Sequence, residues 1–169
     1  PNDGKRYEII DGELYMSPGA NAFHQSAEGN LLIAIGQYCK RTGAGKVFMA
    51  PLDVNPEPKT VVQPDLLFVA KDRLGIIAPD GSRCTGAPDL VIEIISKTTV
   101  NTDMNEKRKK YEEMGVKEYW AVDYMNKRVY VFTPGVDGRY GDPSVISGDA
   151  ALTTPILPGL SISLPEVWE

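Results

Sequence analysis

Residues 86–96 read GAPDLVIEIIS, and within them Leu90–Ile95 is apolar except for Glu93. A short apolar run of this kind predicts a buried β-strand, which we place at Asp89–Ser96. A buried carboxylate without a partner destabilises a fold, so Glu93 requires a cation, a metal ion or a proton beside it. The interpretation of the rest of the chain depends on which partner Glu93 has.

The composition of the whole chain limits the classes of protein it can belong to. Its 169 residues are 42% hydrophobic, which fits one domain spanning residues 1–169. A net charge of −5 argues against an extended basic surface but leaves room for a local basic groove around an acidic metal centre. No apolar run is long enough to cross a membrane, so no membrane partner is expected. Cys39 and Cys84 lack metal-ligand spacing and predict reduced thiols of a cytoplasmic protein.

The apolar periodicity and the turn residues predict a mixed order of strands and helices. The first predicted elements are a hairpin around Asp11-Gly12 and a helix from about Phe23 to Gly43. Three strands follow, at Lys46–Val54, Val61–Ala70 and Asp89–Ser96. A second helix, which Thr102 or Asp103 caps, ends at Met114, and after it come a hairpin around Met125-Asn126 and a strand at Leu160–Leu164. This order predicts a mixed α/β (α+β) domain built on one twisted sheet with helices packed against it.

Asp65 is the first candidate partner for the Glu93 site. If Val61–Ala70 and Asp89–Ser96 pair as antiparallel neighbours around a loop centred near Pro79, the register sets Asp65 opposite Glu93. Directly opposed residues point to the same face, with Cβ atoms roughly 5 Å apart. Two carboxylates so placed repel each other unless a positive charge lies between them. A divalent cation with oxygen ligands meets this need.

Lys107 is the second candidate partner. Met104, Lys107, Tyr111 and Met114 share one face of the predicted second helix, so Lys107 points inward while Arg108 and Lys109 project outward. From this helix Lys107 can reach Glu93. Asp65, Glu93 and Lys107 together predict a site for metal-assisted hydrolysis of a phosphodiester, in which the lysine orients the water and stabilises the developing negative charge.

Four stretches of the chain together resemble a known family. They are YEIIDGELYMSPGANAFHQ at 7–25, QPDLLFV at 63–69, PDLVIEIIS at 88–96 and DMNEKRKKYEEMGVKEYWAVD at 103–123. Their order and spacing are similar to the PD-(D/E)xK restriction-endonuclease-like superfamily, and more narrowly to its Uma-type branch, long catalogued as a domain of unknown function. The resemblance extends from about Arg6 to Trp168.

The resemblance implies a fold and a set of site residues. The implied fold is a restriction-endonuclease-like αβββαβ core with a central mixed sheet, an N-terminal hairpin and additional C-terminal strands. The implied ligands of Mg²⁺ or Mn²⁺ are Asp65, Glu93 and the backbone carbonyl of Ile94. The superfamily lysine stands two residues after the glutamate, where this chain has Ile95. The branch places a lysine on the following helix instead, which matches Lys107.

Three further residues are candidates for contact with the substrate or with the groups that hold the metal. His24 stands where the branch has a histidine and either touches a phosphate or a coordinated water, or is a polar residue that starts a helix. Glu13 follows the Asp-Gly turn and either faces the same cleft or is a solvated hairpin charge. Lys97 lies four residues after Glu93, on the same strand face but beyond the expected strand end, and is the alternative to Lys107.

These observations lead to one main hypothesis with two alternatives. The main hypothesis is a Mg²⁺-dependent endonuclease that cuts phosphodiester bonds in DNA, compatible with a homodimer. The first alternative is a catalytically silent domain of the same fold that binds nucleic acid or another partner, with Asp65, Glu93 and Lys107 as a structural salt-bridge network. The second is a phosphohydrolase of small molecules on a similar metal site.

Overall fold

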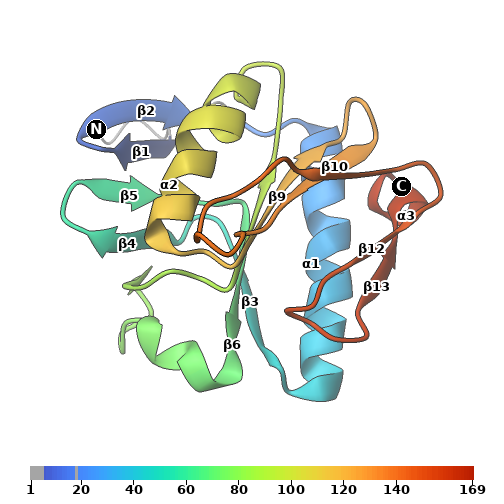
Figure 1. The fold of residues 1–169 in the computed structure, drawn as a ribbon, viewed down its shortest axis with the longest axis horizontal. Helices are drawn as coiled ribbons and strands as arrows, with labels where there is room; N and C mark the ends of the chain where they lie inside the picture. Colours follow the sequence, from blue (N-terminus) through green and yellow to red (C-terminus); the bar gives the residue numbers. More distant parts are fainter. Residues whose placement is uncertain (1–5, 18) are drawn as a thin grey trace.

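The computed structural model describes residues 6–17 and 19–169, and this part begins with the hairpin β1 (Arg6–Ile10) and β2 (Glu13–Ser17) (Figure 1). Asp11 and Gly12 form the turn with φ angles of 53° and 87°, as a two-residue hairpin loop requires. The predicted hairpin is therefore confirmed. It belongs to a small sheet of order β2-β1-β5-β4-β7, which also contains β4 (Asp53–Glu57), β5 (Thr60–Val62) and β7 (Arg83–Cys84).

The central sheet of the described residues has the strand order β11-β10-β9-β8-β6-β3. Its strands are β3 (Gly45–Met49), β6 (Leu66–Ala70), β8 (Leu90–Ile94), β9 (Glu118–Asp123), β10 (Arg128–Phe132) and β11 (Ser144–Ser147). Strands β8 and β9 are parallel, whereas the other neighbouring pairs are antiparallel. The sheet is therefore mixed, as predicted. A parallel pair needs a crossover connection, and here that connection contains the second helix.

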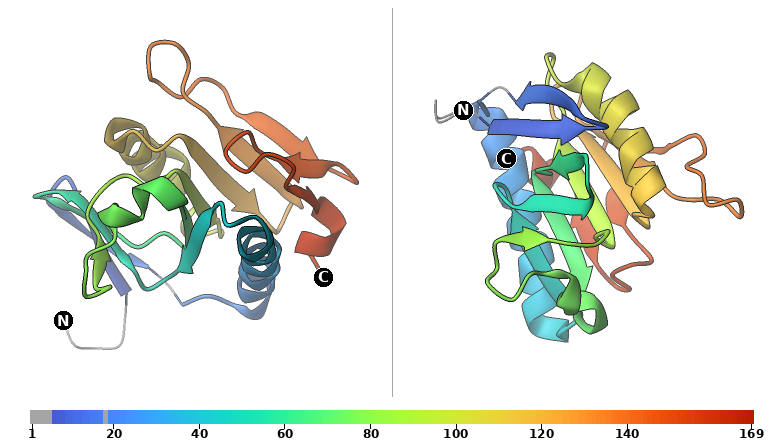
Figure 2. Two further views of the ribbon diagram at one scale, coloured as in Figure 1. Left: turned by 90° about the horizontal axis from the view of Figure 1, so that it is seen from below. Right: turned by 90° about the vertical axis from the view of Figure 1, so that its left-hand side faces the viewer.

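Two helical segments cover opposite faces of the central sheet (Figure 2). Helix α1 (Ala22–Thr42) begins at Asn21, whose side chain accepts a hydrogen bond from the N–H of His24, and ends at Gly43. The second segment consists of a π-helical stretch η2 (Thr102–Lys107) that continues as α2 (Arg108–Met114) and ends at Gly115. Because β-strand side chains alternate between faces, strands β6, β8, β9 and β10 each contribute buried residues to the apolar core on either face of the sheet.

The C-terminal part lies against α1 (Figure 1). It consists of β12 (Ala151–Thr153), β13 (Ser161–Ser163) and the short helix α3 (Leu164–Val167), and Trp168 packs against the same core as α1. A 3₁₀ segment η1 (Lys71–Ile76) follows β6. The additional C-terminal strands are thus confirmed. Among the described residues, none of the helices combines the length and the apolar character needed to cross a bilayer.

Two predicted strands were wrong because each is divided into two. Lys46–Val54 is two strands in different sheets, β3 and β4, separated at Ala50-Pro51. Val61–Ala70 is likewise divided into β5 and β6 around Pro64. Proline has no N–H to donate to a neighbouring strand, which explains why Pro51 and Pro64 lie between strands.

The second helix also begins earlier than predicted. Its helical backbone starts at Val100, before either predicted cap residue, Thr102 or Asp103. Ser96 and Thr99 exchange hydrogen bonds between side chains and backbone N–H groups just before it, which satisfies donors at this end. These boundary errors do not change the order α1-β3-β6-β8-α2-β9, and the expected αβββαβ core is confirmed. The assignment of residues 1–169 to one domain stays a prediction, and residues 1–5 and 18 lie outside the described part.

Candidate active site

Asp65, the residue just before β6, and Glu93, on β8, lie at one end of the central sheet. Strands β6 and β8 pair with Leu66 opposite Ile92, and the same register extended by one residue sets Asp65 opposite Glu93. Asp65 Oδ2 also accepts a hydrogen bond of 2.8 Å from the N–H of Ile94. The predicted register is therefore confirmed. Both carboxylates line one cavity of about 460 Å³.

Segments from across the chain form this cavity. Its walls include the start of α1, the loop after β8, the helical segment η2 and the turn between β9 and β10. Its acidic and basic lining residues are His24, Asp65, Glu93, Lys97, Asp103 and Lys107. All three predicted catalytic residues are thus present in a single concave site, which is where ligands bind in most enzymes.

Lys107 points into the protein, as its helical spacing predicted. Only 5% of the residue is exposed, and its Nζ lies 2.9 Å from Glu93 Oε1 and 2.8 Å from Glu8 Oε2. Burial by itself lowers the pKa of Lys107, but the carboxylates of Glu93 and Glu8 outweigh it and raise this pKa above its usual value. Lys107 is therefore a permanent positive charge beside Glu93.

The two central carboxylates have opposite pKa shifts. Burial raises the pKa of Glu93 well above its usual value, Lys107 opposes this, and the charge of Asp65 adds to it. Burial also acts to raise the pKa of Asp65, but the hydrogen bond and charge of His24 and the N–H of Ile94 outweigh it, so this pKa is lowered. A pair of carboxyl groups whose environments separate their pKa values is typical of functional sites.

Glu93 has a second hydrogen-bond donor besides Lys107. The hydroxyl of Tyr111 donates to Glu93 Oε1 at 2.5 Å, and Tyr111 lies one helical turn after Lys107. Lys107 and Tyr111 both lie on the buried face of the second helix. This face packs on the side of β8 that carries Val91 and Ile95. Glu93 is thus held in one orientation by two side chains of the same helix.

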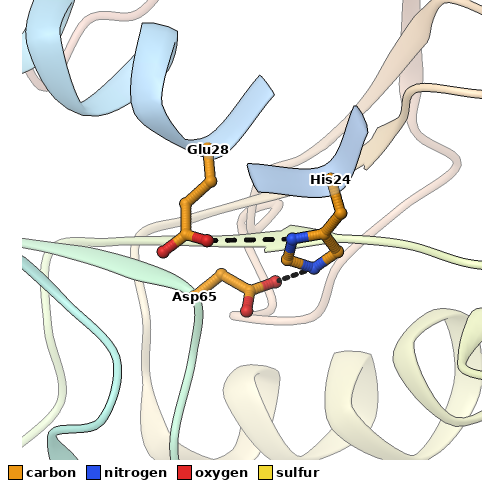
Figure 3. Close-up of side chains that lie close together, drawn as sticks. All are labelled: His24, Glu28 and Asp65. Atoms are coloured by element: carbon orange, nitrogen blue, oxygen red, sulfur yellow. Dashed lines mark ion pairs between the residues drawn. The ribbon is translucent and has the colours of Figure 1, made fainter. Parts of the chain in front are cut away.

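His24 belongs to the site. It is 8% exposed, and its Nε2 lies 3.2 Å from Asp65 Oδ2 (Figure 3). Its Nδ1 lies 3.7 Å from Oε2 of Glu28, one turn further along α1. The ring edge of His24 also meets Tyr124 in the turn after β9, at a centroid distance of 6.5 Å. Of the two interpretations of His24, the contact with Asp65 favours a role in the site.

The remaining predicted candidates lie at the edge of the site or outside it. Lys97 is exposed and lines the cavity, without reaching Glu93 in any contact among the described residues. Glu13 is exposed, accepts a hydrogen bond from Tyr15 and is not part of the cavity wall, which agrees with a solvated hairpin charge. Ile94 lines the cavity and its N–H binds Asp65; the role of its carbonyl as a metal ligand stays a prediction.

Three acidic residues of the site were missed by the sequence analysis: Glu8, Glu28 and Asp103. Glu8 shares the buried face of β1 with Ile10, two residues later, so strand alternation could have found it. Asp103 stands four residues before Lys107 and is 3.7 Å from its Nζ, while Glu28 stands four residues after His24. This i, i+4 spacing was the available signal for both.

The site holds more carboxyl groups than basic groups. Glu8, Asp65, Glu93 and Asp103 are each at most 6% exposed, and they face Lys107 and His24. Burial raises the pKa of Asp103 to about 6, with Lys107 opposing this rise. Buried carboxylates in excess of cations are a donor set for a hard divalent ion, which prefers oxygen ligands. The residues of the cavity therefore fit Mg²⁺ or Mn²⁺.

A mixed sheet between two helices, with an Asp–Glu–Lys cavity at the strand ends, defines a restriction-endonuclease-like protein. The chain belongs to the Uma2 family, whose description is "Putative restriction endonuclease" and whose family model matches residues 1–165. This membership supports a nuclease.

A solved structure has the same fold. It is the crystal structure of "a putative nuclease belonging to DUF820 from Anabaena variabilis ATCC 29413", and it superposes with a TM-score of 0.83 at 20% sequence identity. The match covers 99% of this chain and 92% of the other. At this identity the likeness establishes the fold alone. A comparison with curated proteins found no match.

Proposed function

We propose that this protein is a nuclease that hydrolyses phosphodiester bonds in DNA and depends on Mg²⁺ or Mn²⁺. The observation that carries the proposal is the arrangement of Asp65, just before β6, and Glu93, on the adjacent strand β8, in a cavity where Lys107 touches Glu93. Membership of the Uma2 family supports the same reaction class. A cytoplasmic location and a homodimer, which would present two such cavities to a duplex, are part of this proposal.

Asp65, Glu93 and the carbonyl of Ile94 are the residues that would hold the metal ion. When bound, the ion would neutralise charge on the phosphate and lower the pKa of a water molecule. Asp65 is suited to this role because its lowered pKa keeps it ionised at neutral pH. One oxygen of Glu93, Oε1, accepts hydrogen bonds from Lys107 and Tyr111, and these bonds fix the direction of its carboxylate.

Lys107 would supply the positive charge that the reaction needs near the phosphate. Its Nζ is held by Glu93 and Glu8, so its position does not depend on the substrate. A fixed ammonium group stabilises negative charge that develops in the transition state without reorganising. Lys97 on the cavity wall is exposed and would contact a neighbouring phosphate of the strand, as basic side chains do in most nucleic-acid complexes.

One observation favours a second candidate function. Lys107 has two carboxylate partners at hydrogen-bonding distance, Glu8 and Glu93, so the cluster also forms a salt-bridge network. A catalytically silent domain that binds nucleic acid or another partner would retain such a network for stability. The two candidates differ in whether a divalent ion binds at Asp65 and Glu93.

A cleavage assay tests the proposal. The purified protein is incubated with single-stranded, duplex and branched DNA in Mg²⁺, in Mn²⁺ or with a chelator, and the products are resolved by size. We expect cleavage that requires the metal and falls about 100-fold or more in Asp65→Asn and Glu93→Gln. The control variant is Asp149→Asn, an exposed carboxylate in the turn before β12. Absence of cleavage of any DNA by the folded wild type in either ion would overturn the proposal in favour of the silent domain.

A further inference from the structure

A second cavity, of about 360 Å³, lies next to the candidate active site, and we call it the side cavity. Its walls are the start of α1, the turn between β9 and β10, and the residues that follow α3. Phe23, Tyr124 and Met125 line both cavities, so the two are continuous. We propose that the side cavity holds an unpaired nucleobase of the DNA strand that is cleaved, stacked on Phe23 and Trp168. This inference rests on the proposed function, because that strand is the substrate of the neighbouring site.

The first argument is the aromatic lining of the side cavity. Phe23, in the first turn of α1, is 73% exposed. Tyr124 and Trp168 are half-buried and pack against the core, so the core holds each of them beside the cavity. The hydroxyl of Tyr124 also accepts a hydrogen bond of 2.9 Å from Asn21. Aromatic side chains of this kind bind single-stranded nucleic acid, because every base has a π face that can stack on them.

The second argument is that hydrogen bonds hold the walls of the side cavity in place. Asp123 accepts two hydrogen bonds from Asn126, of 3.0 and 2.8 Å, which fix the turn between β9 and β10. The side chain of Asn30, on α1, donates to the carbonyl of Val167 at 3.3 Å and connects α1 to the C-terminal segment. A preformed cavity does not lose entropy by ordering when a ligand binds. Its volume lies within the usual range of small-molecule pockets, about 300–1,000 Å³.

The third argument is the charge around the two cavities. Lys127 is exposed on the wall of the side cavity, and Lys97 is exposed on the wall of the candidate active site. A strand that crosses both cavities carries a phosphate at each nucleotide, which these lysines can contact. Glu169 also lines the side cavity, and its carboxylate disfavours a phosphate there, whereas a nucleobase is uncharged. The base must be unpaired, because the faces of a base inside a duplex are covered by its neighbours.

Binding of DNA is measured by fluorescence anisotropy at low ionic strength with a chelator, so that binding is separated from cleavage. The probes are a labelled oligothymidylate and a labelled duplex. Phe23→Ala should weaken binding of the single strand about 5- to 100-fold, the usual effect of losing one stacked base, and leave binding of the duplex nearly unchanged. Phe23→Tyr should retain the affinity of the wild type. Ile33→Ala, which removes a 57% exposed apolar side chain elsewhere on α1, is the matched control.

Trp168 supplies a second readout that reports on stacking itself. The chain has two tryptophans, and Trp120 is fully buried in the core, so a bound base can reach only Trp168. We expect oligothymidylate to quench the tryptophan emission of the wild type, and this quenching to disappear in Trp168→Phe. The measurement on the wild type does not depend on any variant folding, and absence of quenching at saturating oligothymidylate would overturn the inference.

The other outcomes separate this inference from the proposed nuclease. If the protein cleaves DNA but Phe23→Ala binds the single strand as tightly as the wild type, the inference fails and the nuclease stands. Wild-type affinity in Phe23→Leu would also overturn it, because leucine keeps an apolar contact without a π face. Single-strand binding that depends on Phe23, in a protein that cleaves no DNA with Mg²⁺ or Mn²⁺, supports the side cavity while the proposed function fails.

Discussion

Lys107 and Glu93 form a buried ion pair, with 2.9 Å between Nζ and Oε1, although 14 residues separate them in the sequence. The same ammonium group lies 2.8 Å from Glu8 in the N-terminal hairpin. A single lysine therefore connects the hairpin, the central sheet and the second helix. Because all three side chains are buried, removal of Lys107 leaves two buried carboxyl groups without their shared cation.

Lys107→Met should destabilise the metal-free protein by about 3–5 kcal/mol, the usual cost of leaving buried charges unpaired. Methionine preserves most of the packing of the side-chain stem, so the loss reports mainly on charge. The free energy of unfolding is measured by urea titration with a chelator present. Lys109→Met, at a side chain that is 65% exposed and pairs with Glu113, is the matched control and should change stability by less than about 1 kcal/mol. Equal stability of the two variants would contradict the buried pairing.

The opposite pKa shifts of Asp65 and Glu93 predict opposite effects of their amide variants. The folded protein disfavours ionised Glu93, because its pKa is raised by burial, so Glu93→Gln should stabilise the metal-free protein at neutral pH. The folded protein favours ionised Asp65, whose pKa is lowered despite burial, so Asp65→Asn should destabilise it. We expect about 0.5–2 kcal/mol in each direction.

The pH dependence of these two effects has a definite sign. Both carboxyl groups are protonated in the folded and unfolded states at low pH, so the amide variants should then resemble the wild type. The stability gained in Glu93→Gln should appear as pH rises above the ordinary pKa of a glutamate. The stability lost in Asp65→Asn should return as pH falls below the ordinary pKa of an aspartate. Urea titrations across the acidic range measure both, and a stabilised Asp65→Asn variant would show that Asp65 is repelled rather than held.

The sequence was sufficient to predict those residues whose position follows from a single element or a single strand pair. Strand alternation and the loop midpoint set Asp65 opposite Glu93, and the helical period turned Lys107 inward. These positions depend on regular geometry that tertiary packing does not alter. The π-helical stretch around Asp103 changed the helix locally but left Lys107 and Tyr111 on the buried face.

The missed residues depend on how separate elements dock together. Strand alternation places Glu8 on the same face as Ile10, but no local pattern states that the second helix covers this face. Lys110 belongs to a run of basic residues that is typical of a solvated face. It is nevertheless buried, because its ammonium group pairs with Asp11 and Glu57 of other segments. Polar residues become buried when partners from distant segments compensate their charge, and a sequence shows the charges without showing that proximity.

Mg²⁺ should stabilise the folded protein through Asp65 and Glu93. An ion that binds only the folded state adds about 2.7 kcal/mol when its concentration is 100 times the dissociation constant. We expect the melting temperature to rise with Mg²⁺ or Mn²⁺ and to fall again with a chelator, and this response to be lost in Asp65→Asn. Asp149→Asn, at an exposed position in the turn before β12, should respond as the wild type does. A melting temperature independent of both ions would favour the silent, salt-bridged domain.

Asp103 should make the metal-free protein less stable as pH rises through the weakly acidic range. Its pKa is raised by burial from 3.8 to about 6 in the folded state, so the folded protein binds a proton there that the unfolded chain has lost. Stability therefore falls between about pH 4 and pH 6, by about 3 kcal/mol in total, and is flat with respect to this group outside that window. Asp103→Asn removes this dependence. We expect the variant to match the wild type at about pH 4 and to be the more stable protein at about pH 8, in urea titrations with a chelator. A variant that is less stable than the wild type at the higher pH would show instead that ionised Asp103 is needed to hold Lys107.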